Sequence, residues 1–253
     1  MTWVDRVVAA LPASVTAKAP PPAGESAATL RRRKRTVAGV SLAGAALLGA
    51  SLSTKPDSPA FYGLTLGVAA TWTLGGLASG PLHLGRTPHR DKTAPPSRRP
   101  VITPVLLGAG AFGVFYGCAL VSRHIPILNR AISGVLQYAH RGSDRQVLVT
   151  TLANGAAEEV FFRGALYAAA SGKHPVAVST AVYSLATAAT RNPALVLASG
   201  VMGALFALQR KATGGIQAPI LTHLTWSALM LRFLPPLFPS QSQAAVVARG
   251  IKP

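Results

Sequence analysis

The sequence predicts an all-α protein, a polytopic helical bundle that crosses a membrane. Of its 253 residues, 49% are hydrophobic and only 13% are charged, whereas soluble domains carry about 25% charged residues. Several apolar stretches also approach the roughly 20 residues that a helix needs to cross a bilayer. The sequence shows neither a soluble domain nor a clear internal repeat, so one transmembrane helical domain is expected.

Seven stretches of the chain are candidates for membrane-spanning helices. They are residues 37–53, 60–84, 101–122, 147–170, 176–190, 194–208 and 216–234. The fifth and sixth are short for a bilayer, so we expect about seven spans, within a range of six to eight. Small residues in the third stretch predict close packing against a neighbouring helix. These are Gly108, Gly110, Gly113 and Gly117.

The remaining segments lie before, between and after these spans. Residues 1–36 are expected to form a basic N-terminal segment, with a short interfacial helix near its start and the cluster Arg31-Arg-Arg-Lys-Arg35 near its end. Residues 123–145 predict a surface or interfacial helix. Its expected buried side consists of Ile127, Ile132, Val135, Leu136 and Tyr138. The transmembrane helical domain is then 37–235, followed by a polar tail over 236–253.

The formal net charge of +18 comes from basic residues spread over short loops and chain ends. A nucleic-acid-binding protein would concentrate such charge on one soluble face. We therefore expect membrane lipids as partners, since anionic headgroups attract basic segments, and no nucleic acid. A cytoplasmic N-terminus puts 31–35, 86–99, Lys173 and 210–211 on the cytoplasmic side, as the positive-inside rule favours. The expected location is the plasma membrane of a bacterium.

Two neighbouring acids, Glu158 and Glu159, stand inside an apolar stretch of a chain that has only seven acidic residues. Insertion scales put a mid-bilayer carboxylate at roughly 2.5 to 3.5 kcal/mol, so such acids are expected to be functional. In a helix, Glu159 and Arg163 share one face as i and i+4, whereas Glu158 lies about 100° round. Arg163 would neutralise Glu159 and leave Glu158 free for chemistry. A purely structural pair is the alternative, and it leaves Glu158 unexplained.

Few other polar groups fall within the apolar stretches. His223 and Ser227 are i and i+4 on the last span, and Tyr183 and Thr187 have the same spacing on the fifth. Ordinary helix–helix hydrogen bonds would explain the second pair. Ionisable groups inside a membrane tend to face one another, so His223 is a candidate partner of the glutamates.

The pattern Glu158-Glu159-x-x-x-Arg163 is similar to the EExxxR motif of the CPBP intramembrane proteases. This family includes the type II CAAX prenyl endopeptidases and bacteriocin-processing or self-immunity proteins. The resemblance covers roughly residues 100–235, which would be the protease-like core, and the Phe-Phe-Arg-Gly ending of the first motif is its most specific part.

The other two family motifs are only partly present. The family's second motif is FxxxH, and Tyr183 and Thr187 stand at its positions, so its histidine is missing. The third motif is HxxxN or HxxxD, and here His223 is followed by Ser227. The hydroxyls of Thr187 and Ser227 can still donate hydrogen bonds, but with a shorter reach than the expected side chains.

The resemblance implies an intramembrane endopeptidase that cleaves a peptide bond of a membrane-associated substrate. Glu158 would be the base that activates a water molecule, and Glu159 would be a partner tied to Arg163. His223 would help to hold the oxyanion, together with Ser227. Losing such a donor lowers the rate roughly 10²- to 10³-fold.

A metal is a separate question, because members of the family are commonly labelled metalloproteases. A zinc site usually needs three protein ligands, and the sequence contains no HExxH pattern. Glu158, Glu159 and His223 would supply three ligands only if Glu159 left Arg163. We therefore expect no obligate metal or other cofactor, with zinc as the alternative.

Two other functions remain open at this point. The replacements at Thr187 and Ser227 are also typical of a catalytically impaired member of the fold, acting as a membrane scaffold or an immunity-type binding protein. A small transporter or channel that moves protons through the buried acids is the third hypothesis, and it rests only on the energetic cost of burying them.

Overall fold

The computed structural model describes residues 12–19, 25–87, 99–170, 172 and 174–239. These parts of the chain form helices, turns and loops without any β-strand, which confirms the predicted all-α class. The interfacial helix expected near the N-terminus and the tail beyond residue 239 lie outside the described residues.

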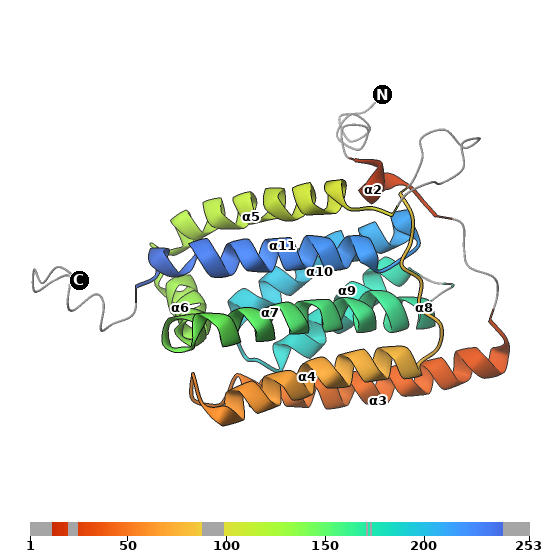
Figure 1. Ribbon diagram of the computed structural model, residues 1–253, viewed down its shortest axis with the longest axis horizontal. Helices are drawn as coiled ribbons and strands as arrows, with labels where there is room; N and C mark the ends of the chain where they lie inside the picture. Colours follow the sequence, from red (N-terminus) through yellow and green to blue (C-terminus); the bar gives the residue numbers. More distant parts are fainter. Residues whose placement is uncertain (1–11, 20–24, 88–98, 171, 173, 240–253) are drawn as a thin grey trace, which may run out of the picture.

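The long helices run side by side along the longest axis, and α6 lies across one end of the bundle (Figure 1). The helices are α2 (Ala13–Thr16), α3 (Ala27–Ser51), α4 (Pro59–Ala78), α5 (Ile102–Ser122), α6 (Pro126–Arg141), α7 (Asp144–Glu158), the π-helix η1 (Glu159–Leu166), α8 (Tyr167–Ala169), α9 (Pro175–Ala188), α10 (Pro193–Thr213), α11 (Gln217–Phe233) and the 3₁₀ turn η2 (Pro235–Leu237). Neighbouring pairs pack along their lengths, namely α3 with α4, α5 with α11 and α9 with α10.

The first long helix, α3, begins at Ala27 rather than at Val37. Ser26 caps it by accepting a hydrogen bond from the backbone N–H of Thr29, as N-cap serines commonly do. The cluster 31–35, which we expected outside the helix, therefore lies within its first turns. The boundary expected after residue 36 falls inside α3.

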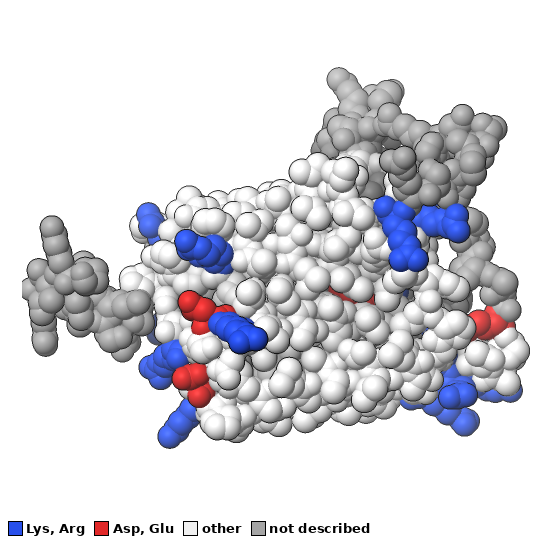
Figure 2. Space-filling view, in the orientation of Figure 1, with Lys and Arg blue, Asp and Glu red and all other residues white. Residues whose placement is uncertain are grey.

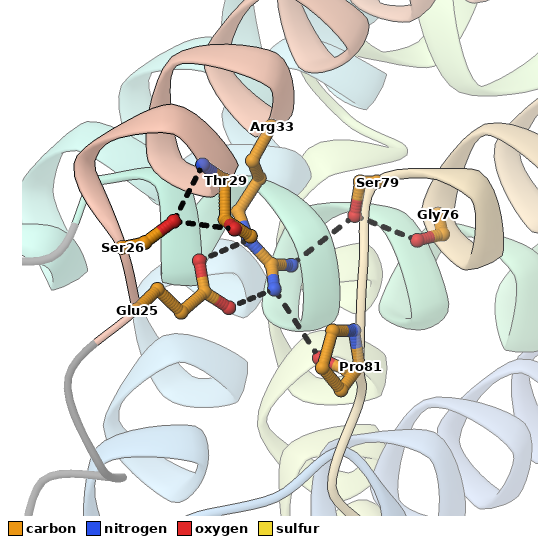
Figure 3. Close-up of polar contacts among 7 residues, drawn as sticks. All are labelled: Glu25, Ser26, Thr29, Arg33, Gly76, Ser79 and Pro81. Carbon is orange, nitrogen blue, oxygen red and sulfur yellow. Dashed lines mark hydrogen bonds and ion pairs between the residues drawn. The ribbon is translucent and has the colours of Figure 1, made fainter.

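Arg33 differs from the rest of its basic cluster, because it is fully buried while its four neighbours are exposed. Its guanidinium donates hydrogen bonds to Glu25 and to the Ser79 hydroxyl, 3.2 Å away, and it also reaches the carbonyl of Pro81 (Figure 3). Arg33 thus ties α3 to the end of α4. Arg33, expected with its neighbours in a basic N-terminal segment, is instead a buried helical residue.

Two other helices end at positions that the apolar stretches did not indicate. Helix α4 ends at Ala78 and is followed by Gly80 at φ 135°. Helix α10 continues beyond residue 208 to Thr213, where Gly214 at φ 73° ends it, since glycine adopts the left-handed conformation at little cost. Arg210, expected in a loop, is therefore a buried helical residue.

The helix predicted over 123–145 is α6, and it covers the end of the bundle. Leu136 and Tyr138 are buried as expected, whereas Ile127 is 63% exposed, so that part of the predicted buried side is wrong. The Tyr138 hydroxyl lies 2.8 Å from the carbonyl oxygens of Leu52 and Thr54. This contact fixes α6 to the turn between α3 and α4.

The surface of the bundle has the character of a membrane protein. On the face in Figure 2, Lys and Arg gather toward the two ends, with a largely uncharged surface between them. Helices α4, α5 and α10 are long and apolar enough to cross a membrane. The count of about seven spans stays a prediction. Of the four glycines in α5, Gly108 lies against Thr222 and Thr225, whereas the other three face open space.

Candidate active site

A change of helical geometry positions the two glutamates. Helix α7 ends at Glu158, and η1 continues the same chain direction as a π-helix from Glu159 to Leu166. Short π-helical segments are rare in proteins, and those that occur are often found at functional sites. The sequence pattern predicted a regular α-helix here, so this feature was missed. Glu159 and Arg163 still meet, with 3.3 Å between Oε1 and Nη1.

Glu159 is completely buried and lies between two cationic or polar partners. Its Oε1 atom accepts from Arg163 and lies 2.9 Å from Nδ1 of His223 on α11. Arg163 also donates to the carbonyl of Gly203 at 3.1 Å. The ring of Phe206 stacks on His223 with 4.7 Å between centroids. The predicted Glu159–Arg163 pair is present, and His223 joins it.

The contact with Glu159 determines what His223 can do. An ionised Glu159 accepts a hydrogen bond, which places the hydrogen of a neutral imidazole on Nδ1. Nε2 then has no hydrogen to donate. The oxyanion role implied by the family resemblance is therefore open to His223 only in its doubly protonated form.

Glu158 has a different environment from Glu159. It is only partly buried, and its Oε2 accepts a hydrogen bond of 2.7 Å from the hydroxyl of Tyr183 on α9. Oε1 has no hydrogen-bond partner among the described residues. The two carboxylates therefore separate as the sequence predicted, with Glu159 in the ion pair and Glu158 outside it.

An apolar cavity of about 530 Å³ lies against Glu158. Its wall comes from α6, from most of the length of α7, and from the halves of α3, α4, α5, α10 and α11 that lie toward α6. The polar side chains at its inner end include Glu158, Asn154 and Ser227, and the free thiol of Cys118 also lines it. The Ser227 hydroxyl has no hydrogen-bond partner within the described chain. Glu158 and Ser227 thus face one largely apolar space.

The structure does not bring Thr187 into this group. Its hydroxyl donates to the backbone carbonyl of Tyr183 at 2.9 Å, and Thr187 is not part of the cavity wall. Tyr183 is the residue from α9 that reaches a glutamate. It was absent from the predicted site, although a phenol in an otherwise apolar stretch was a signal that could have identified it.

The side chains at this site do not fit a three-ligand zinc centre. Within the described ranges, His, Cys, Asp and Glu side chains form no group of three that could hold a metal ion. Oε1 of Glu159 and Nδ1 of His223 are hydrogen-bonded to each other. Glu158 is hydrogen-bonded to Tyr183 and not to either of them. Zinc sites in proteins usually have three or four such ligands.

Comparison with known proteins points to the same part of the chain. Residues 145–229 match the family model described as "Type II CAAX prenyl endopeptidase Rce1-like". No curated protein and no solved structure matched the chain. The matched residues run from α7 to α11. They include both glutamates and the side chains that contact them, which are Arg163, Tyr183 and His223. Together with the apolar helices, the match indicates an integral membrane protein. The predicted resemblance to the CPBP family is thus confirmed over residues 145–229, the part of the chain that is similar to type II CAAX prenyl endopeptidases.

Proposed function

We propose that this protein is an intramembrane endopeptidase in which Glu158 activates a water molecule to attack a peptide bond. The observation that carries the proposal is the unequal placement of the two acids. Glu159 is buried in a pair with Arg163, whereas Glu158 lines the apolar cavity, and its Oε1 has no hydrogen-bond partner in the part of the chain that the structure describes. Hydrolysis in a membrane needs such a base beside a space that admits the substrate.

The proposed reaction uses water and the peptide alone. Glu158 takes a proton from the water, and the water oxygen bonds to the peptide carbonyl carbon. The C–N bond then breaks, and the proton passes from Glu158 to the leaving nitrogen, as in general acid–base catalysis. Ser227, whose hydroxyl faces the same cavity, is placed to donate to the developing oxyanion. His223 holds Glu159 and becomes a second donor only when protonated.

The surroundings of the site support a membrane-associated peptide or protein as the substrate. The cavity wall is apolar, and pockets of several hundred cubic ångströms commonly bind apolar groups oriented by a few polar atoms. The exposed Arg31, Arg32, Lys34 and Arg35 on α3 favour a cytoplasmic N-terminus by the positive-inside rule. We infer anionic lipid contacts at that end, a bacterial plasma membrane as the location, and no partnership with nucleic acid.

The native thiol of Cys118 allows a direct test of the cavity, because it is the only cysteine in the chain. The natural protein is purified in detergent and assayed against a library of membrane peptides. N-ethylmaleimide should add to Cys118, fill part of the cavity and reduce turnover to background. The matched variant Cys118→Ser should keep its turnover after the same treatment. Full turnover by a protein whose mass shows complete modification would contradict the proposal.

A catalytically impaired scaffold or immunity-type binding protein is the second candidate. The position of Thr187 favours it, because its hydroxyl is bound to a backbone carbonyl and lies outside the cavity wall. In this case the natural protein would show no turnover against the library. The double variant Thr187→His, Ser227→Asn should then acquire turnover, and single variants serve as its controls. Measurable turnover by the natural protein would exclude this candidate.

A further inference from the structure

Tyr183 makes the one hydrogen bond that the described residues offer to the carboxylate of Glu158. Its hydroxyl lies 2.7 Å from Oε2, a distance typical of an O–H group bonded to an oxygen acceptor. The two residues come from different helices, since Glu158 ends α7 and Tyr183 lies within α9. The contact therefore depends on the packing of the bundle.

The ring of Tyr183 is held on several sides. It packs on Phe162 with 4.8 Å between centroids, and the guanidinium of Arg163 lies 4.6 Å from its centre. At Gly203 of α10, an added Cβ would lie 3.1 Å from Cδ1 of the ring. Glycine at that position gives the ring room. The hydroxyl therefore has little freedom to leave Glu158.

We propose that Tyr183 is a positioning residue for the reaction assigned to Glu158. By bonding Oε2, it fixes the orientation of the carboxylate and leaves Oε1 for the water. A carboxylate on three freely rotating bonds would otherwise sample many orientations, and a misplaced base loses much of its effect. This inference rests on the proposed function, and it adds a residue from α9 to the machinery.

The first test is Tyr183→Phe, which keeps the ring and removes only the hydroxyl. Loss of one hydrogen bond to a charged group should lower kcat roughly 10- to 100-fold, and KM should change little because Tyr183 is not part of the cavity wall. Tyr167→Phe is the matched control. Tyr167 lies on α8, and its hydroxyl makes no hydrogen bond to either glutamate in the structure. The variant removes this hydroxyl and should keep the natural kcat.

A second readout does not require turnover. Infrared difference spectra against Glu158→Gln isolate the carboxyl band of Glu158. Tyr183→Phe should shift that band, and Tyr167→Phe should not. An unshifted band would overturn the contact, and a shifted band with natural kcat would overturn the positioning role. If the natural protein cleaves nothing, the proposed function and this role fail together, while the band shift still reports whether the contact exists.

Discussion

Replacing Glu158 by glutamine is expected to lower turnover about 10²- to 10⁴-fold, the range that general acid–base catalysis contributes. Glutamine has nearly the same shape, and its amide oxygen can still accept from Tyr183, but it cannot take a proton from water. The cavity and the Glu159 pair should be unaffected, so the thermal unfolding midpoint in detergent should stay close to that of the natural protein. Steady-state cleavage of a library peptide measures the effect.

Asp144→Asn provides the matched control for this change. Asp144 begins the same helix, α7, and is exposed and outside the cavity wall. It undergoes the same carboxylate-to-amide replacement and should retain natural turnover. Equal turnover by the Glu158→Gln and Asp144→Asn proteins would remove Glu158 from the reaction. The buried ion pair between Glu159 and Arg163 would then be the only role supported for the two glutamates.

The fold could be predicted from the sequence wherever an apolar stretch ends at a clear break. The third stretch, 101–122, nearly coincides with α5 (Ile102–Ser122). Prediction failed where helices continue through basic residues, as at the start of α3 and the end of α10. Arginine and lysine are good helix formers, so a drop in hydropathy marks the end of an apolar face and not of the helix. None of the partners of Arg33, which are Glu25, Ser79 and Pro81, is adjacent to it in sequence.

The site could be predicted only as far as local spacing reaches. The i and i+4 spacing predicted a contact between Glu159 and Arg163, and the structure confirms that contact. The contact between His223 and Glu159 spans 64 residues and depends on how α11 packs. The Tyr183–Glu158 bond likewise depends on the placement of α9. Tertiary packing therefore determines which partner each of the two glutamates has, and residue spacing along the chain does not predict it.

The buried pair should also dominate stability, and Arg163→Met is expected to lower the free energy of unfolding by about 3 to 5 kcal/mol. Methionine has a similar length but leaves the carboxylate of Glu159 with His223 alone, at a position without exposure. Denaturant titration in detergent measures the change. Arg33→Met is the control, because Arg33 is equally buried but its partner Glu25 is 29% exposed at the side chain, so water can replace the lost contact and the effect should be smaller.

A double replacement distinguishes two causes of the destabilisation, the loss of the contacts of Arg163 and the burial of an unpaired Glu159 carboxylate. If most of the cost in Arg163→Met is the unpaired Glu159, then Glu159→Met combined with Arg163→Met should be considerably more stable than Arg163→Met alone, since apolar pairs often replace buried ion pairs at little cost. Equal stability of the single and double variants would mean that the arginine acts through its other contacts, with Gly203 and with the rings of Tyr183 and Phe206. In that case the contacts of Arg163 with α9 and α10, and not its ion pair with Glu159, would stabilise the bundle.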